Sequence, residues 1–309
     1  MMRIAITGSS GYLGQQLVRR LVGDREVETV VGIDTRDPKD PHPKLNFYAR
    51  DVTVDFHDVF ITEKVDVAVH LAFVVRPSRD ERGVRQINVG GTERFIAACR
   101  ESGLRHAVYL SSTTAYGAYA DNVVPLTEES PLRPNEAFQY SKDKAAADIL
   151  FQRFGEGTER PLVTVLRSCP VIGPNSFDAI GARVFQPIMI RVLGHDPPMQ
   201  FIHEDDLINL LVYAIKEKMA GIFNVAGEGL VGYSELATVA RKPMLVLPRV
   251  FLSPLLQATW WARLQSASSA AGLVYIMHPW VVDAGRFVRE GGFRYRYSSE
   301  DAVRCLLQG

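Results

Sequence analysis

The first half of this chain alternates short apolar segments with longer segments whose apolar residues recur at helical spacing. The apolar segments, predicted to be strands, are 3–6, 27–33, 45–49, 65–71, 107–110 and 162–166. The predicted helices between them are 12–22, 84–99 and 139–154. Parallel strands require crossover connections, which helices supply. The alternation therefore predicts an α/β fold, a doubly wound parallel sheet with helices on both faces.

The pattern weakens after residue 168, where the turn-forming pairs Cys169-Pro170 and Gly173-Pro174 follow. We predict a helix at 179–192, strands at 201–202 and 222–225, and a helix at 206–217. The expected organisation is an N-terminal domain at 1–168, to which 200–226 return, and a smaller C-terminal α/β lobe made of 169–199 and 227–309. The expected functional cleft lies between the two.

Charge and cysteine usage restrict the partners and the compartment. Lys plus Arg equals Asp plus Glu at 35 each, so the chain lacks the basic excess of nucleic-acid-binding proteins. The three cysteines form no CxxC pair, which indicates a reducing compartment and predicts a cytoplasmic protein. No metal site is predicted.

The most apolar stretch of the sequence is 244–277. Arg249, Pro254 and Arg263 interrupt it, so it is too short to cross a bilayer, and no integral membrane segment is predicted. We interpret the stretch as a buried or pocket-lining helix, with contact to a membrane surface as the alternative. Trp260 and Trp261 are predicted to pack in the core, and otherwise to form a wall for an apolar substrate.

A glycine-rich loop at 7–14, TGSSGYLG, joins the first strand to the first helix. Gly8 permits a sharp turn, Gly11 permits close approach of a phosphate, and Gly14 permits close packing of the helix on the sheet. The helix N-terminus offers N–H groups to an anion. The loop predicts a dinucleotide phosphate site, with an ordinary strand–helix turn as the alternative. The predicted phosphate-binding residues are Gly8, Ser10, Gly11, Tyr12, Leu13 and Gly14.

Acidic residues end the second and third predicted strands. Asp34, 20 residues after Gly14, is placed to accept both ribose hydroxyls of an adenosine, which favours NAD. Arg36 leaves NADP possible, because a guanidinium binds a 2′-phosphate, although it can also stack on adenine. Asp51 and Val52 are predicted to contact the adenine ring, and an ordinary strand end is the alternative.

Tyr140 and Lys144 are four residues apart in a predicted helix, which places them on one face. A lysine there can hold ribose hydroxyls and lower the pKa of the tyrosine, which is near 10 in a free phenol. Ser112 follows the fifth strand, at the sheet edge where ligands bind. These three residues predict a proton-transfer site.

Further segments extend the pattern in chain order: 70–72 HLA, 88–92 NVGGT, 111–117 SSTTAYG, 140–144 YSKDK, 166–174 LRSCPVIGP and 201–207 FIHEDDL. With these motifs the chain resembles the extended short-chain dehydrogenases/reductases of the NAD-dependent epimerase/dehydratase group. The resemblance implies a Rossmann fold, a nicotinamide cofactor, a homodimer formed through 84–99 and 139–154, and catalysis by Ser112, Tyr140 and Lys144. It also implies cofactor contacts from Leu71, Ala72, Phe73 and Pro170, and support of the active-site backbone by Asn88.

The chain departs from that family in positions that bind substrate. Pro170 replaces an asparagine, Met199-Gln200 replace an arginine, and no Arg or Lys occurs between Arg263 and Arg286. A buried diphosphate needs cationic partners, so these changes weaken the assignment to nucleotide sugars. Thr113 and Thr114 replace the acid and base of the 4,6-dehydratases, which disfavours elimination.

Together the residues predict an NAD(P)-dependent oxidoreductase or epimerase acting on a secondary alcohol or ketone of a small molecule. One alternative is a catalytically idle NAD(P)-binding regulatory protein, because some members of the family it resembles keep the glycine loop and lose the tyrosine or the lysine, both of which this chain keeps. Another is a reductase or dehydrogenase of an apolar, steroid- or lipid-like alcohol, suggested by the 244–277 stretch.

Overall fold

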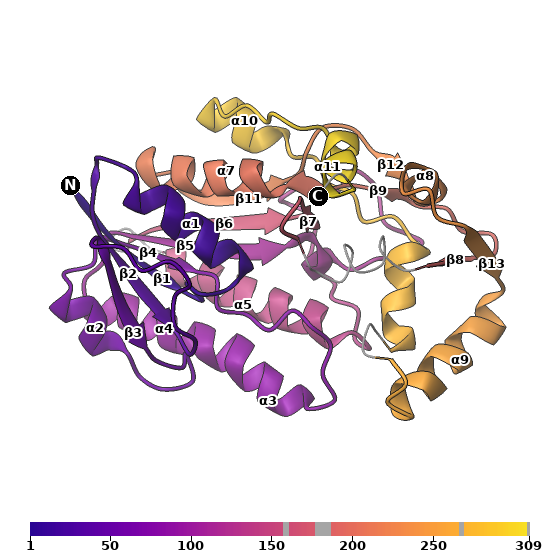
Figure 1. The fold of residues 1–309 in the computed structure, drawn as a ribbon, viewed down its shortest axis with the longest axis horizontal. Coiled ribbons are helices and arrows are strands. Elements are labelled where there is room, and N and C mark those ends of the chain that lie inside the picture. Colours follow the sequence, from indigo (N-terminus) through magenta and orange to yellow (C-terminus); the bar gives the residue numbers. More distant parts are fainter. Residues whose placement is uncertain (157–160, 177–186, 266–268, 308–309) are drawn as a thin grey trace.

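The computed structural model of this chain describes residues 1–156, 161–176, 187–265 and 269–307 (Figure 1). Its centre is a sheet of seven strands in the order β11-β6-β5-β4-β1-β2-β3, with every neighbouring pair parallel. In that order the strands are Gly221–Val225, Leu162–Ser168, His106–Ser112, Val67–His70, Met2–Thr7, Val27–Asp34 and Leu45–Ala49. From β1 the strands are added first on one side, as β2 and β3, and then on the other side, as β4, β5, β6 and β11. This strand order confirms the predicted Rossmann-type fold.

Helices cover both faces of the sheet (Figure 1). On one face lie α1 (Tyr12–Val22) and α7 (Glu204–Lys216), and on the other lie α2 (His57–Thr62), α4 (Gly91–Glu101) and α5 (Gln139–Gly155). Side chains alternate along a strand, so β1 serves both layers. Ile4 and Ile6 pack with α1 and α7, whereas Ala5 packs with the opposite layer.

The helix predicted at 84–99 is a continuous run of three pieces. These are α3 (Glu81–Arg85), a π-helical turn η1 (Gln86–Gly90) and α4. A π-turn rotates one residue out of the helical register and is frequent at functional sites. Here it carries Asn88, which is fully buried.

The helix predicted at 179–192 is wrong over its last turn. Met189–Val192 form strand β8, which pairs in parallel with β13 (Met244–Leu247). A short apolar run carries no periodicity that separates a strand from a helix, and only the partner β13 decides between them. Residues 179–186 lie outside the described residues.

The buried or pocket-lining helix predicted in 244–277 is shorter than expected and mostly not buried, although part of it lines a cavity. The stretch divides into β13, helix α9 (Arg249–Trp261) and the 3-10 helix η3 (Ala270–Ile276). Pro248 caps α9 at its start, and Arg263, with a left-handed φ of 59°, follows its end. Of the α9 residues, all of which are described, Leu252 alone is buried.

A third apolar cluster, which includes Leu236, Leu252 and Tyr275, is formed mainly by elements of the C-terminal part of the chain. The remaining elements are η2 (Thr113–Tyr116), β7 (Val171–Ile172), β9 (Pro198–Met199), β10 (Ile202–His203), β12 (Val231–Gly232), α8 (Tyr233–Val239), α10 (Gly285–Gly291) and α11 (Ser299–Leu306). Of these, α10 packs against β11 through Phe287, which belongs to the same apolar cluster as Ile4 and Ile6. None of the helices within the described ranges combines the length and the apolar character needed to span a bilayer.

Two buried histidines in the sheet predict acid sensitivity. His70 lies between Thr7 and Thr92, and burial lowers its pKa to about 3. Burial lowers the pKa of His106 to about 4. Below the ordinary histidine pKa near 6.5 the unfolded chain binds more protons, so stability present at neutral pH is lost as the pH falls. Each histidine contributes about 1.4 kcal/mol per pH unit to this loss.

We therefore expect the free energy of unfolding, measured in urea, to fall steeply between about pH 6.5 and pH 4.5. The His70→Asn variant should show roughly half of the wild-type slope, because one of the two groups is removed. An unchanged slope would contradict the assignment to His70.

Candidate active site

The loop between β1 and α1 can be built only with glycine at two positions. Gly8 has φ of +73°, and a Cβ there would lie 2.7 Å from the backbone nitrogen of Ala72. A Cβ on Gly14 would lie 2.1 Å from the carbonyl oxygen of Gly8. Helix α1 then begins after Gly11, which offers no side-chain cap. The glycines thus keep their positions in the loop free of side chains, next to the N-terminal N–H groups of α1.

The hydroxyls in this loop suit an anionic ligand. The Oγ atoms of Ser9 and Ser10 are buried and have no hydrogen-bond partner among the described residues. A buried hydroxyl without a partner costs free energy, and phosphate oxygens would supply acceptors. The cradle and its hydroxyls therefore fit a dinucleotide phosphate.

Asp34 closes the neighbouring corner at the end of β2. Its Oδ2 accepts a hydrogen bond from the Ser10 N–H at 3.0 Å, and its Oδ1 accepts one from the Arg36 N–H at 3.0 Å. The Arg36 side chain is 70% exposed, and its Nε lies 3.7 Å from the carboxylate. The carboxylate is thus fixed beside the loop, and the largely exposed guanidinium also donates a hydrogen bond to the Ser10 carbonyl at 3.4 Å.

Beside the loop lies a cavity of about 310 Å³. It brings together these predicted residues: Gly8, Gly11, Tyr12, Leu13, Gly14, Leu71, Phe73, Ser112, Tyr140, Lys144 and Pro170. The cavity lies where the carboxyl ends of β1, β4, β5 and β6 meet, which is the expected ligand position in such a sheet.

The other predicted residues do not line this cavity: Ser10, Asp34, Arg36, Asp51, Val52, Ala72 and Asn88. Asp51 accepts a hydrogen bond from the Thr53 N–H at 2.8 Å. Val52 is buried against Gly91, and a Cβ added to Gly91 would lie 2.7 Å from the Cγ2 of Val52. These contacts favour the strand-end interpretation of Asp51 and Val52.

Lys144 is buried among aromatic rings. Its Nζ donates a hydrogen bond to the Leu110 carbonyl at 2.7 Å and lies 3.7 Å from the Phe73 ring centroid and 6.0 Å from that of Tyr140. Burial lowers its pKa to about 7. Lys144 therefore changes between its ammonium and neutral amine forms close to neutral pH.

This burial predicts a pH effect on the stability of the ligand-free protein. Between the folded pKa and the ordinary lysine value near 10.4, the unfolded chain binds more protons, so stability rises with pH. We expect the unfolding free energy to rise by about 2 kcal/mol from pH 7 to pH 9 in the wild type. Lys144→Met should remove this rise, whereas Lys142→Met on the same helix should keep it. A rise that persists in Lys144→Met would contradict the assignment.

Ser112 ends β5, and Thr114 holds its side chain in place through two hydrogen bonds. Its Oγ accepts hydrogen bonds from the Thr114 N–H at 3.2 Å and from the Thr114 hydroxyl at 3.0 Å. The Thr114 carbonyl in turn accepts from the Ser141 hydroxyl at 2.7 Å and the Tyr275 hydroxyl at 3.1 Å. Ser112 is thus tied to α5, which carries Tyr140 and Lys144.

Asn88 braces the loop after β4. Its Oδ1 accepts a hydrogen bond from the Val74 N–H at 2.7 Å, and its Nδ2 donates to Asp143 at 3.2 Å. Asp143 on α5 also pairs with Arg85 at 2.9 Å. The π-turn therefore links the loop that carries Phe73 to the helix that carries Tyr140.

Two groups of supporting residues were not predicted. Arg167 and Asp148 form a buried pair at 2.9 Å, and Asp148 also accepts from the Ser111 hydroxyl at 2.6 Å. The second group is aromatic: Phe138 lies 5.2 Å from Tyr275, and Tyr275 lies 5.1 Å from Trp280, measured between ring centroids. These three rings line the 310 Å³ cavity. No local pattern identifies them, because Tyr275 and Trp280 reach the site only through the tertiary fold.

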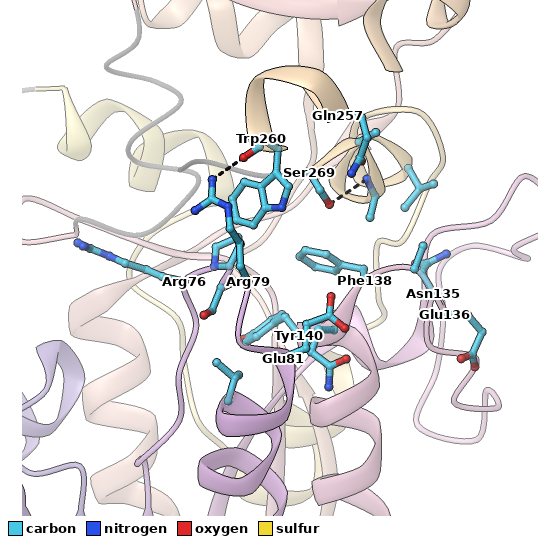
Figure 2. Close-up of a pocket in the computed structure, with 18 of the residues that line it drawn as sticks. Arg76, Arg79, Glu81, Asn135, Glu136, Phe138, Tyr140, Gln257, Trp260 and Ser269 are labelled. Atoms are coloured by element: carbon cyan, nitrogen blue, oxygen red, sulfur yellow. Dashed lines mark hydrogen bonds between the residues drawn. The ribbon is translucent and has the colours of Figure 1, made fainter. Parts of the chain in front are cut away.

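A second cavity, of about 1040 Å³, adjoins the first (Figure 2). The two share four lining residues, Val75, Pro77, Phe138 and Tyr140. Arg76, Arg79, Arg249 and Arg263 also line the larger cavity. Figure 2 shows Arg79 on the Trp260 ring, with its Cζ 4.3 Å from the centroid, and Tyr140 across from it.

The tryptophans correct the prediction of core packing. Trp260 and Trp261 both line the larger cavity, and Trp261 is 76% exposed. Trp260 forms the wall on which Arg79 stacks, and its carbonyl accepts a hydrogen bond from Arg79 at 2.5 Å. Helix α9 places both tryptophans at the cavity, because one side of the helix borders the cavity and the other side is exposed to solvent.

The sequence model of the NAD dependent epimerase/dehydratase family matches residues 4–226. This chain belongs to that family. The predicted family, and with it an NAD-dependent enzyme, is confirmed. An uncharacterized protein of Mycobacterium tuberculosis is 24% identical over 99% of this chain and 83% of its own length. A UDP-glucose 4-epimerase of Lacticaseibacillus casei is 31% identical over 46% of this chain and 44% of its own.

Solved structures show the same fold. MoeE5 in complex with UDP-glucuronic acid and NAD has a TM-score of 0.77 at 20% identity, covering 99% of this chain and 98% of its own. UDP-glucuronic acid 4-epimerase from Bacillus cereus, in complex with NAD, has a TM-score of 0.75 at 17% identity, covering 98% of this chain and 97% of its own.

Proposed function

We propose that this family member oxidises a secondary alcohol of an anionic sugar nucleotide, and in epimerisation re-reduces the product, with Ser112, Tyr140 and Lys144 as its catalytic residues. The observation that carries the proposal is the position of Tyr140. It lines both the cavity beside the glycine loop and the larger cavity lined by arginines. A residue at that junction can contact a cofactor on one side and a substrate on the other.

The phosphate loop is proposed to hold the pyrophosphate of NAD, with Ser10 and the N-terminus of α1 as donors and Asp34 at the adenosine ribose. When bound, NAD supplies the hydride acceptor of the reaction. The deprotonated phenol of Tyr140 would take the proton of the substrate alcohol, becoming the neutral phenol, and would return that proton at re-reduction. The Ser112 hydroxyl donates to the same substrate oxygen. The Lys144 ammonium favours the deprotonated phenol by its charge.

The larger cavity is lined by four arginines and by two glutamates, Glu81 and Glu136, and this excess of positive charge favours an anionic substrate. A diphosphate needs guanidinium or N–H partners, and the family positions for them are Met199, Gln200 and Pro170 in this chain. Arg79, Arg249 and Arg263 line the cavity from other positions, on the loop after β4 and at the two ends of α9. We propose that these three replace the missing clamp. The relatives crystallised with UDP-glucuronic acid or UDP-glucose support the substrate class.

Epimerisation or net oxidation is favoured over 4,6-dehydration. Elimination of water needs an acid and a base next to the catalytic hydroxyl. Thr113 and Thr114 follow Ser112 here, and neither carries a carboxylate. Thr113 is buried, with its hydroxyl directed to the Ser168 carbonyl at 3.4 Å.

The cofactor preference has its own test. Asp34→Asn should weaken NAD binding by about tenfold, because a charge-assisted pair to the ribose becomes a neutral one. The variant should also narrow the preference for NAD over NADP, since a 2′-phosphate no longer meets a carboxylate. Asp37→Asn, exposed in the following loop, is the control and should bind as the wild type does. Equal affinities in Asp34→Asn and the wild type would refute the ribose assignment.

Turnover is tested by incubating the NAD-loaded protein with UDP-glucose and UDP-glucuronic acid and resolving the products by chromatography. We expect a 4-epimer or an oxidised sugar with reduced cofactor. Retained NAD without product on any sugar or alcohol would favour the idle regulatory protein instead. Turnover of steroid-like alcohols alone would favour the apolar-alcohol enzyme.

The homodimer is proposed to form through α4 and α5, as the family resemblance implies. Light scattering coupled to size exclusion should give the mass of two chains. The mass of one chain at high concentration would contradict it.

A further inference from the structure

Helix α9 has two faces with different surroundings. Arg249, Ser253, Gln257 and Trp260, at spacings of four, four and three, line the 1040 Å³ cavity. The other side carries Val250, Phe251 and Leu255, which are 70%, 67% and 55% exposed. Trp261, which also borders the cavity, is 76% exposed. Leu264, just beyond the helix, is 77% exposed. These five residues are called the α9 apolar face below.

The α9 apolar face is a continuous stripe. Its members recur at helical spacing, and the positions between them on the same side are Pro254, Ala258 and Ala262, all exposed. No charged residue stands between Arg249 and Arg263. Isolated exposed apolar side chains are ordinary, but a contiguous stripe of large ones marks a contact surface.

The charge around the stripe indicates what it contacts. No Asp or Glu occurs between Glu235 and Asp283, whereas Arg241, Lys242, Arg249 and Arg263 fall in that interval. The chain as a whole has no net charge, so the segment from 236 to 282 carries an excess of positive charge. Arg241, Arg249 and Arg263 are exposed. An apolar stripe with cationic ends and a terminal tryptophan is typical of helices that lie in a membrane interface.

The position of α9 permits such contact. It lies at one end of the long axis of the molecule, opposite α2 and away from the central sheet (Figure 1). Leu252 is buried and Leu256 packs against the third apolar cluster, so the helix is anchored while its outer side stays open. A flat surface could therefore cover the stripe without displacing the sheet.

We propose that the α9 apolar face docks on the surface of an anionic phospholipid bilayer. Phe251, Leu255 and Trp261 enter the boundary between head groups and acyl chains, while Arg241 and Lys242 pair with lipid phosphates. The opposite face of α9 lines the cavity that adjoins Tyr140, so docking places that cavity next to the bilayer. This proposal does not depend on which alcohol the enzyme oxidises.

Vesicle sedimentation of the full chain tests the proposal. We expect the wild type to sediment with vesicles of phosphatidylcholine mixed with phosphatidylserine and to remain in solution with phosphatidylcholine alone. The double variant Phe251→Ser/Leu255→Ser should bind at least about tenfold more weakly, because two apolar side chains no longer enter the interface. Arg241→Gln/Lys242→Gln should also weaken binding, and added salt should reduce the wild-type affinity.

The control is Ile61→Ser on α2, which is 51% exposed in the wild type and lies at the opposite end of the molecule. It should bind vesicles as the wild type does. Circular dichroism and NAD titration should show that each variant is folded. Absence of wild-type binding to the anionic vesicles, or equal binding by the α9 variants, would overturn the proposal. A wild-type dimer that Phe251→Ser/Leu255→Ser converts to a monomer, without vesicle binding, would assign the face to a second copy instead.

Discussion

Tyr140→Phe should lower kcat by about 10²–10⁴-fold, because the variant loses the phenol oxygen that exchanges a proton with the substrate. Its ring should still pack against Phe73 and Phe138, whose centroids lie 5.9 and 6.1 Å away. NAD affinity and the midpoint of thermal unfolding should therefore change little. Steady-state turnover of the sugar nucleotide identified as substrate, with NAD titration alongside, measures both effects.

The matched control is Tyr297→Phe, which removes a hydroxyl far along the chain while keeping the ring stacked on His203 at 3.9 Å. It should retain wild-type turnover. A Tyr140→Phe variant with wild-type kcat would remove Tyr140 from the mechanism, although the fold and the cofactor site would stand.

Asp148→Asn should destabilise the fold strongly, because it breaks a buried ion pair. The Asp148 carboxylate accepts hydrogen bonds from Arg167 Nε at 3.0 Å and Nη2 at 2.9 Å, and both side chains are almost fully buried. Removing one charge leaves the guanidinium buried without its partner, which costs about 3–5 kcal/mol. Urea unfolding of the ligand-free protein measures the change.

Asp58→Asn is the comparison for this variant, since Asp58 forms an exposed ion pair with Arg50 at 3.0 Å. Its loss should stay below about 1 kcal/mol, because water screens and replaces such a pair. Losses of similar size in the two variants would show that the buried pair does not stabilise the fold as described.

The sequence predicts the parts of this protein that depend on local pattern. The strand-to-helix glycine loop, the Tyr140–Lys144 spacing and Ser112 at a strand end are each readable within a few residues, and the cavity brings them together. Adjacent motifs in a parallel sheet converge on one edge, so spacing along the chain translates into proximity.

The predictions from the sequence fail where contacts between distant segments determine the local structure. Met189–Val192 form a strand because β13, more than fifty residues later, pairs with them. The arginines at 79, 249 and 263 meet only because α9 folds over the loop after β4. Their spacing in the sequence carries no motif, so a search for a clamp at the family positions could not find them.

The proposed mechanism requires that a dinucleotide lies over the glycine loop with its reactive end beside Tyr140. The most direct measurement is a crystal structure of the NAD complex. We predict the pyrophosphate at the N-terminus of α1, a ribose at Asp34, and the nicotinamide ring in the 310 Å³ cavity next to Tyr140 and Lys144. A dinucleotide bound elsewhere, or a nicotinamide ring outside that cavity, would contradict the account.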